Sequence, residues 1–139
     1  MFSTTIHATS RILIADDDPV IRHLVTRLVE KANYKTVVCA DGREAARVLQ
    51  SDSNFCGAIF DMMMPHLEGL ELIRFMRTEK RLMRIPVLMI TSESDLKLMA
   101  NSFSAGATLF LPKPFTADQF HNTFKLLLSN SSNKVVRTT

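Results

Sequence analysis

Several residue types on which common protein architectures depend are scarce in this sequence. There is no tryptophan, one tyrosine and two cysteines, Cys39 and Cys56, in 139 residues. The two cysteines lack the close spacing of a metal motif, and they are too few for a disulfide framework. We therefore interpret them as small buried hydrophobic residues of a protein in a reducing cytoplasm.

Long apolar runs are absent too. No stretch approaches the roughly 18–20 consecutive apolar residues of a membrane-spanning helix, so we expect no transmembrane segment and no membrane partner. The first residues, MFSTTIHATS, lack the basic start and apolar core of a signal peptide, and we expect a flexible lead-in over 1–9. With 46% hydrophobic and 22% charged residues, the chain suits one soluble domain.

A moderate excess of positive charge, +3 at neutral pH, raises the question of nucleic-acid binding. Part of the excess comes from RTEKRLMR (77–84) and part from the C-terminal tail. A nucleic-acid surface would combine a basic face with aromatic or base-reading side chains. We interpret 77–84 instead as a solvated connection between a helix and a strand, and we expect no direct nucleic-acid contact.

Five short apolar segments alternate with helical patterns along the chain. The predicted strands are 11–15, 35–40, 57–60, 86–90 and 108–111. The helices begin at Asp18-Pro19, Asp41, Gly69 and two capping-box patterns, SESD (92–95) and TADQ (116–119). Because the strands are continuously apolar, they predict a parallel sheet with helices on both faces. We expect one doubly wound α/β domain over 10–128, followed by a flexible tail or cut linker over 129–139.

Polar residues stand where these predicted strands end. Asp16 and Asp17 follow the first strand, Asp61 the third, Thr91 the fourth and Lys113 the fifth. Doubly wound sheets bind ligands beyond the carboxyl ends of their strands. Two carboxylates about 5 Å apart repel by roughly 3 kcal/mol at an effective dielectric of about 20. The cluster should therefore raise a carboxylate pKa or recruit a hard cation such as Mg²⁺, whereas zinc or copper would require histidine or cysteine ligands.

Asp61 has a chemical task in such a cluster. Aspartate is a known nucleophile for phosphoryl groups, and the charge of a transferring phosphoryl is stabilised by cations and hydrogen-bond donors. A bound metal ion, the Lys113 ammonium and the Thr91 hydroxyl would supply that stabilisation. Each residue alone has a simpler explanation, such as helix capping or solvation, which we accept only for Asp18.

The motifs ILIADDDP, IFDMMMPHLEG, MITSES and LPKPF, in this order and spacing, resemble those of response-regulator receiver domains of two-component signalling. The resemblance is to receivers of the chemotaxis-regulator type and runs from about 10 to 128. The resemblance implies a flavodoxin-like (βα)5 fold with strand order 2-1-3-4-5. It implies that Asp61 accepts a phosphoryl group from a phosphohistidine of a sensor histidine kinase or histidine phosphotransfer protein. It also implies Mg²⁺, for which Mn²⁺ can substitute, bound by Asp16 (mainly through water), Asp17, Asp61 and the backbone carbonyl of Met63.

The resemblance extends to a switch. It implies a cis peptide bond after Lys113, and a Thr91 hydroxyl that moves toward the phosphoryl group with an aromatic side chain following it inward. That aromatic is Phe110, where tyrosine is frequent in the family; a plain hydrophobic residue at the sheet edge is the competing interpretation. We further hypothesise that Met63 and Glu93, two residues beyond Asp61 and Thr91 respectively, govern loss of the phosphoryl group.

The output of such a domain would be a protein contact. The expected surface comprises the fourth helix, the fifth strand and the fifth helix, around Leu96, Met99, Phe103 and Phe110. The chain could be a complete receiver or one excised from a larger kinase or regulator. It could also be a pseudo-receiver, or a Mg²⁺-dependent phosphohydrolase of the haloacid dehalogenase type. Because that hydrolase class needs a second acid where Met63 stands, we expect a signalling switch that catalyses only its own phosphorylation and dephosphorylation.

Overall fold

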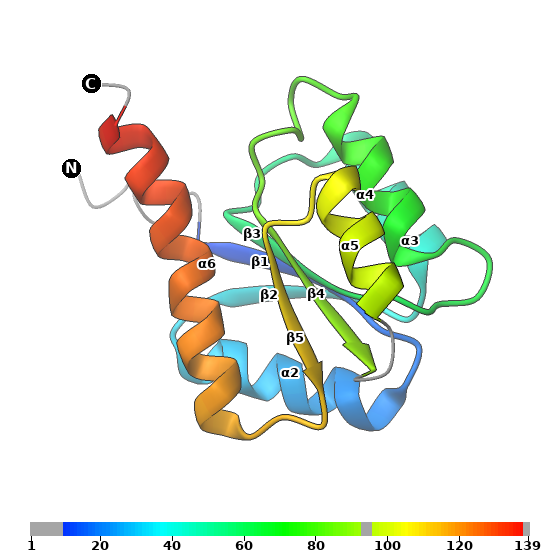
Figure 1. Ribbon diagram of the computed structural model, residues 1–139, viewed down its shortest axis with the longest axis vertical. Helices are drawn as coiled ribbons and strands as arrows, with labels where there is room; N and C mark the ends of the chain where they lie inside the picture. The colour runs from blue at the N-terminus through cyan, green and yellow to red at the C-terminus, as the bar shows by residue number, and fades with distance from the viewer. Residues whose placement is uncertain (1–9, 93–95, 138–139) are drawn as a thin grey trace.

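The protein is described here by a computed structural model covering residues 10–92 and 96–137 (Figure 1). Its strands are β1 (Arg11–Ala15), β2 (Lys35–Cys39), β3 (Gly57–Asp61), β4 (Val87–Ser92) and β5 (Leu109–Lys113). Its helices are α2 (Pro19–Lys31), α3 (Gly42–Ser51), α4 (Gly69–Arg77), α5 (Leu96–Ala105) and α6 (Ala117–Arg137). Within these ranges, no helix has both the length and the apolar character to cross a membrane.

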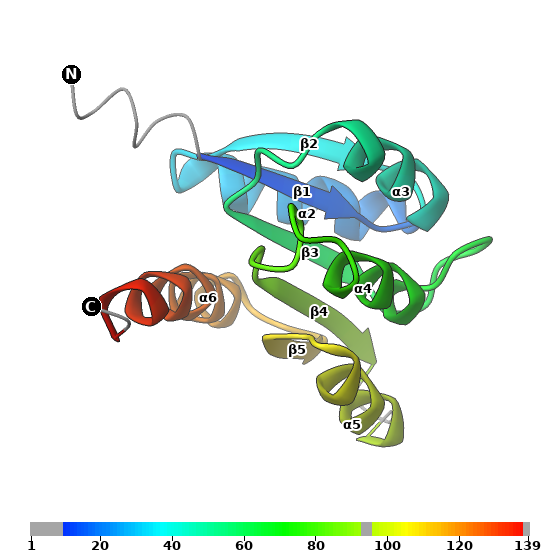
Figure 2. The same ribbon diagram turned by 90° about the horizontal axis from the view of Figure 1, so that it is seen from above.

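The five strands form one parallel sheet in the order β2-β1-β3-β4-β5, as predicted. Helices α2 and α6 cover one face, while α3, α4 and α5 cover the other (Figure 2). Alternate side chains of β1 supply the two cores. Ile12 and Ile14 pack with α2 and α6, whereas Leu13 and Ala15 pack with α3 and α4. A strand buried on both faces has to be apolar throughout, which explains the continuous apolar runs of the sequence.

The predicted helix starts are confirmed where the structure describes them. The Asp18 carboxylate accepts hydrogen bonds from the backbone N–H groups of Val20 and Ile21, at 2.9 and 3.5 Å. At the start of α6, Thr116 and Gln119 bond each other reciprocally: the Gln119 N–H donates to Thr116 Oγ1 at 3.1 Å, and the Thr116 N–H donates to Gln119 Oε1 at 2.9 Å. This is a capping box. The other predicted box, SESD, falls mostly on 93–95, outside the described residues.

Helix α6 is longer than expected. We predicted the domain to end at 128 with a loose tail beyond it, but the helix continues to Arg137. The physical reason is that no glycine or proline occurs between Ala117 and Arg137, so nothing in the sequence terminates the helix. The division into 1–9, 10–128 and 129–139 stays a prediction.

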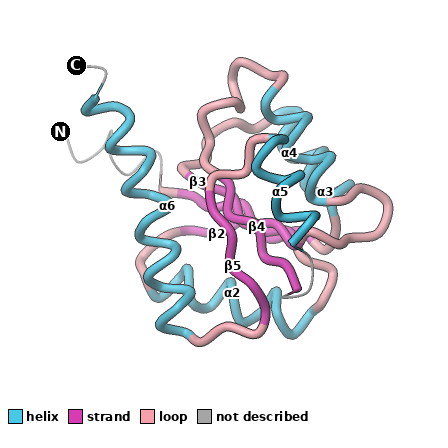
Figure 3. The backbone as a smooth tube through the Cα atoms, in the orientation of Figure 1, coloured by secondary structure: helices cyan, strands magenta, loops and turns pink. Residues whose placement is uncertain are grey.

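Residues 77–84 are only partly the solvated connection that we expected. The segment after α4 is a loop (Figure 3), but the Arg77 side chain is half-buried. Its guanidinium donates hydrogen bonds to the backbone carbonyls of Gly106 at 2.8 and 3.1 Å, Met83 at 3.0 Å and Ile85 at 2.9 Å. Burial lowers its pKa. Arg77 therefore joins α4 to the segments that lead into β4 and β5, and it is a structural residue.

Both cysteines are free, as expected. Cys39 is buried and Cys56 half-buried. Burial raises the pKa of each thiol to about 11, so both are protonated and unreactive near neutral pH.

Candidate functional site

Buried polar side chains lie at the carboxyl edge of the sheet. Among the described residues, the buried polar or charged side chains are Asp16, Asp61 and Thr91, at 2%, 6% and 2% exposed. Asp16 follows β1, Asp61 ends β3 and Thr91 is the last residue but one of β4. These strands are parallel, so the three residues lie at the same edge of the sheet. A buried ionisable group is unfavourable unless a partner compensates it, so their concentration at one edge indicates a site.

Three carboxylates converge there. One oxygen each from Asp16, Asp17 and Asp61 lies within 4.8 Å of the other two. Asp17 is exposed, whereas the other two are buried. The Asp16 carboxylate accepts a hydrogen bond from the Asp18 N–H at 2.9 Å, which fixes its orientation at the entrance of α2. The sequence prediction of an acidic cluster is confirmed.

In addition to the effect of burial, the carboxylates of the cluster raise one another's pKa. The pKa of Asp61 is raised to about 7, chiefly by burial and then by the nearby Asp16 charge, while Lys113 lowers it in part. Burial also raises the pKa of Asp16, against the hydrogen bond from Asp18. The single ammonium group therefore does not neutralise the cluster.

Lys113 reaches the cluster from β5. Its Nζ lies 3.4 Å from Asp61 Oδ1, forming an ion pair between a half-buried lysine and a buried carboxylate. The peptide bond between Lys113 and Pro114 is cis, as the family resemblance implied. A cation at this position can contact both Asp61 and any anionic group attached to it.

Thr91 lies next to Ile90, the residue that pairs with Asp61 across β3 and β4. Its hydroxyl donates to Met62 Sδ at 3.6 Å and lies 3.5 Å from the Ser92 carbonyl. These are long, weak contacts, and a strong acceptor near Asp61 would compete with them for the hydroxyl proton.

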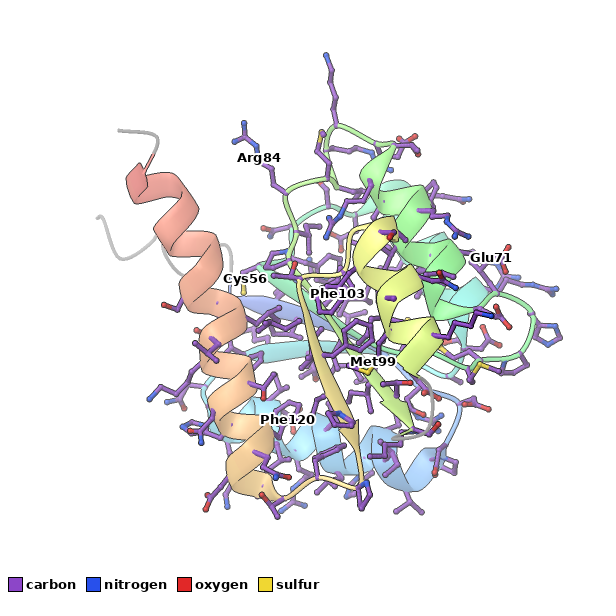
Figure 4. All side chains as sticks on the ribbon, viewed as in Figure 1. Cys56, Glu71, Arg84, Met99, Phe103 and Phe120 are labelled. Atoms are coloured by element: carbon purple, nitrogen blue, oxygen red, sulfur yellow. The ribbon has the colours of Figure 1, made fainter. Side chains whose placement is uncertain are left out.

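The aromatic residue on β5 is half-buried. The Phe110 ring packs edge to face on Phe103 of α5, with ring centroids 4.8 Å apart at 67°. Phe103 itself is 51% exposed. Figure 4 shows Phe103 and Met99 on α5 beside β5, so this face presents apolar side chains to solvent.

The three methionines that follow Asp61 differ in exposure. Met62 and Met64 are buried, as expected for side chains that fill irregular gaps, whereas Met63 is 55% exposed. Glu93, the predicted partner of Met63 in dephosphorylation, lies outside the described residues. Its role stays a prediction.

Sequence reasoning missed the part played by Gly69 at the start of α4. Its N–H donates to the Met62 carbonyl at 3.1 Å. A Cβ at this position would lie 2.6 Å from the Asp61 carbonyl oxygen and 2.8 Å from Met89 Cε. Only glycine lets α4 approach the strand that bears Asp61 this closely. The glycine just before an amphipathic helix was the available signal.

The residues present fit a divalent metal ion. Three carboxylates supply hard oxygen ligands. The pKa of Asp61 stays raised although Lys113 is near, so one ammonium group does not offset the burial and the neighbouring Asp16 charge. Histidine and cysteine are absent from this group of ligands, which favours magnesium over zinc.

A doubly wound parallel sheet with three carboxylates, a lysine and a threonine at its carboxyl edge defines a class: proteins that accept a phosphoryl group on aspartate. Residues 12–125 match the family model described as the response regulator receiver domain, and the chain belongs to this family.

Known relatives agree. The chemotaxis protein CheY of Pseudomonas aeruginosa is 32% identical over 107 residues, covering 77% of this chain and 86% of that protein. The response regulator MprA of Mycolicibacterium vanbaalenii is 32% identical over 122 residues, which are 88% of this chain but 52% of that protein. The structure of CheY4 of Vibrio cholerae matches with a TM-score of 0.80 and 31% identity, covering 86% of this chain and 99% of its own.

The predicted fold and function are thereby confirmed. The chain is a phosphoacceptor domain of two-component signalling, and a phosphohydrolase is not favoured. Receiver domains as a family interact with histidine kinases and with downstream targets. The chain spans about half the length of the MprA relative, 52%, and most of the length of the CheY relative, 86%.

Proposed function

We propose that Asp61 is the phosphoryl acceptor of this receiver domain. The observation that carries the proposal is the position of its carboxylate: buried, 3.4 Å from the Lys113 ammonium and within 4.8 Å of Asp16 and Asp17. Among the acids of this cluster, Asp61 is the one in contact with that cation. The attacking oxygen of Asp61 is therefore held in a fixed position and is largely shielded from water.

Phosphorylation transfers one group between two residues. An Asp61 oxygen bonds to phosphorus while the phosphorus–nitrogen bond of a phosphohistidine breaks, and the freed imidazole takes up a proton. Lys113, whose Nζ is already at Asp61, then binds a phosphoryl oxygen. The Thr91 hydroxyl exchanges its weak contact with Met62 for another phosphoryl oxygen.

The same residues would hold Mg²⁺, with Mn²⁺ as a substitute. Asp17 and Asp61 would be direct ligands, Asp16 would act mainly through water, and the Met63 carbonyl would complete the protein ligands. When bound, the ion supplies positive charge that offsets the carboxylates and the incoming phosphoryl oxygens. Because Asp17 is exposed, it also marks the side from which the ion can enter.

We infer that the Phe110 ring changes position when Asp61 is phosphorylated and thereby changes the nearby protein surface. Movement of the Thr91 hydroxyl toward Asp61 would vacate space behind it, and the half-buried Phe110 ring could turn inward, away from Phe103. The face formed by α5, β5 and α6 would then change shape, and we propose that a downstream protein binds there. The exposed Phe103 and the half-buried Met99 are apolar contacts for such a partner.

The phosphodonor would be a sensor histidine kinase or a histidine phosphotransfer protein. Val20 and Leu24 lie one turn apart on α2 and are 73% and 40% exposed, and Met63 is exposed in the loop that follows Asp61. Helix α2 begins just after β1 and Met63 just after β3, so these apolar side chains follow the strands that end at the acidic site and suit an apolar helical surface. The protein would act as a switch rather than an enzyme, without nucleic-acid contact. A reducing compartment such as the cytoplasm is proposed from its two free thiols.

Phosphoryl loss should depend on Met63. An exposed thioether two residues after Asp61 cannot orient an attacking water, whereas an amide can. Replacing Met63→Asn is expected to change the dephosphorylation rate of the phosphoprotein several-fold, measured by intact mass after removal of the donor. An unchanged rate would contradict the role of Met63, and with it the proposed pairing with Glu93.

Mapping of the modified residue tests the proposed acceptor. The protein is treated with acetyl phosphate and Mg²⁺ and then reduced with borohydride, which converts an aspartyl phosphate into homoserine. Peptide mass spectrometry should find homoserine at position 61 and unmodified aspartate at positions 16 and 17. Conversion at another aspartate would assign the chemistry elsewhere.

A further inference from the structure

The amino edge of the sheet, opposite the acidic site, carries a pocket of about 330 Å³. It is formed by two segments, 53–56 before β3 and 81–86 before β4. The described residues that line it include two arginines, Arg81 and Arg84, and no acid. Its size is at the lower end of the range of about 300–1,000 Å³ for small-molecule pockets.

The floor of the pocket is apolar. Phe55 and Ile85 are 6% and 5% exposed, and Pro86 beside them is also buried. The Cys56 thiol forms part of the wall, and it is protonated because burial raises its pKa to about 11. The interior therefore adds no negative charge and offers apolar contact to a compact group.

The rim of the pocket is cationic. Arg81 and Arg84 are both exposed, and Arg81 donates one hydrogen bond, to the Gln50 carbonyl at 3.0 Å. No hydrogen bond or ion pair is found for Arg84 in the part of the chain that the structure describes, and Figure 4 shows its side chain extending into solvent. Most of the donor capacity of these two guanidinium groups is available to a ligand.

The acid that directly precedes the pocket segment 53–56 is already paired. Asp52 pairs with Arg11 at 2.9 Å, and that guanidinium lies 4.6 Å from the centroid of the Phe55 ring. The Arg11–Asp52 pair is close to neutral, so the charged side chains that line the pocket itself are the cations Arg81 and Arg84. The lining of the pocket is positive, in contrast to the acidic edge at the other end of the strands.

We propose that this pocket binds a small organic anion, a phosphate or carboxylate group carried on a compact apolar body. The apolar body would rest on Phe55 and Ile85, and the anionic group would lie between Arg81 and Arg84. Guanidinium groups bind carboxylate and phosphate through paired hydrogen bonds, which makes arginine the suitable residue here. A ligand with only one of the two parts leaves half of the pocket unused.

The site is separate from the phosphorylation chemistry. β3 and β4 begin at the pocket and reach Asp61 and Thr91 only at their opposite ends. An anion at the amino edge therefore leaves access to Asp61 open. The inference does not rest on the proposed role of Asp61, and the two can fail independently.

The test uses phenyl phosphate as the probe, with the full chain, in buffer free of Mg²⁺ so that no phosphoryl transfer occurs. Amide shifts in two-dimensional NMR should change at Phe55, Cys56 and Ile85 and saturate. Phenol and inorganic phosphate, titrated separately, should each bind at least about tenfold more weakly. Equal binding of phenol would refute a role for the arginines, and equal binding of inorganic phosphate would refute one for the apolar floor.

Matched arginine variants complete the test. Replacing Arg81→Gln or Arg84→Gln should weaken phenyl phosphate binding about tenfold, since each removes a charged hydrogen-bond donor. Arg74→Gln changes an exposed arginine of α4 outside the pocket and should leave binding unchanged. All three variants should retain dispersed spectra and the phosphorylation of the unaltered protein. Unchanged affinity in both pocket variants would overturn the proposal.

Discussion

At the scale of single residues, the site is explained by where charge is buried. Asp16, Asp61 and Thr91 are polar residues placed in an otherwise apolar interior, and Lys113 is the cation that reaches them. Their identities were predicted from the sequence, because each directly follows an apolar strand. The consequence for Asp61, a pKa raised to about 7 chiefly by burial, required the structure.

The raised pKa of Asp61 should make the folded state less stable as pH rises. The folded state holds the proton up to about pH 7, whereas the unfolded state releases it near 3.8. Without Mg²⁺, the contribution of Asp61 to stability therefore falls as pH rises from about 4 to about 7. Replacing Asp61→Asn should stabilise the protein by about 2–4 kcal/mol at pH 8 and by little at pH 4.

Urea unfolding in EDTA measures this difference. Asp52→Asn is a useful control, because its partly exposed carboxylate has a lowered pKa, through its hydrogen bond with Arg11, and should not be stabilised by the change. A stability gain for Asp61→Asn that is the same at pH 4 and pH 8 would contradict the burial of a charged carboxylate.

At the scale of helices and strands, the sequence predicted those features that depend on residues close together in the chain. The helix starts at Asp18 and Thr116 were predicted because a capping side chain bonds to a backbone group three residues away or fewer. Arg77 was interpreted as a solvated residue because its acceptors are not local. The Ile85 carbonyl lies in the segment that leads into β4, and the Gly106 carbonyl lies before β5. Helix α6 extends further than expected because polar composition alone does not terminate a helix.

Arg77 should be important for stability despite lying outside the acidic site. Replacing Arg77→Ala leaves the Gly106, Met83 and Ile85 carbonyls without their guanidinium donor. We expect the free energy of unfolding to fall by about 2–4 kcal/mol. Arg74→Ala, an exposed arginine on the same helix, should change it by less than about 0.5 kcal/mol. Equal effects of the two substitutions in urea unfolding would contradict the structural role of Arg77.

At the scale of the whole molecule, the sheet has two ends of opposite charge. Its carboxyl edge gathers three carboxylates, and its amino edge carries the Arg81 and Arg84 pocket. Between these ends, the exposed Phe103 and the half-buried Met99 of α5 lie beside β5. The layered topology was predictable from the alternation of strands and helices, but the basic pocket joins segments that the sequence separates and was not foreseen.

Metal binding should be visible in the stability of the whole fold. Because Mg²⁺ would bind the folded carboxylates and not the unfolded chain, a tenfold excess over Kd should stabilise the protein by about 1.4 kcal/mol. Asp17→Asn should weaken this stabilisation while keeping the fold, since Asp17 is exposed. Thermal unfolding with Mg²⁺ and with EDTA measures the effect. Equal Mg²⁺ stabilisation of the variant would remove Asp17 from the ligands.

Phosphorylation of Asp61 is tested most directly by intact mass spectrometry. The protein, Asp61→Asn and the control Asp52→Asn are each mixed with acetyl phosphate, with Mg²⁺ or with EDTA. The unaltered protein and Asp52→Asn should gain the mass of one phosphoryl group only with Mg²⁺, and Asp61→Asn should gain none. A phosphoryl group on Asp61→Asn, or none on the unaltered protein with any small donor, would contradict an Asp61 acceptor assembled by Asp16, Asp17 and Lys113.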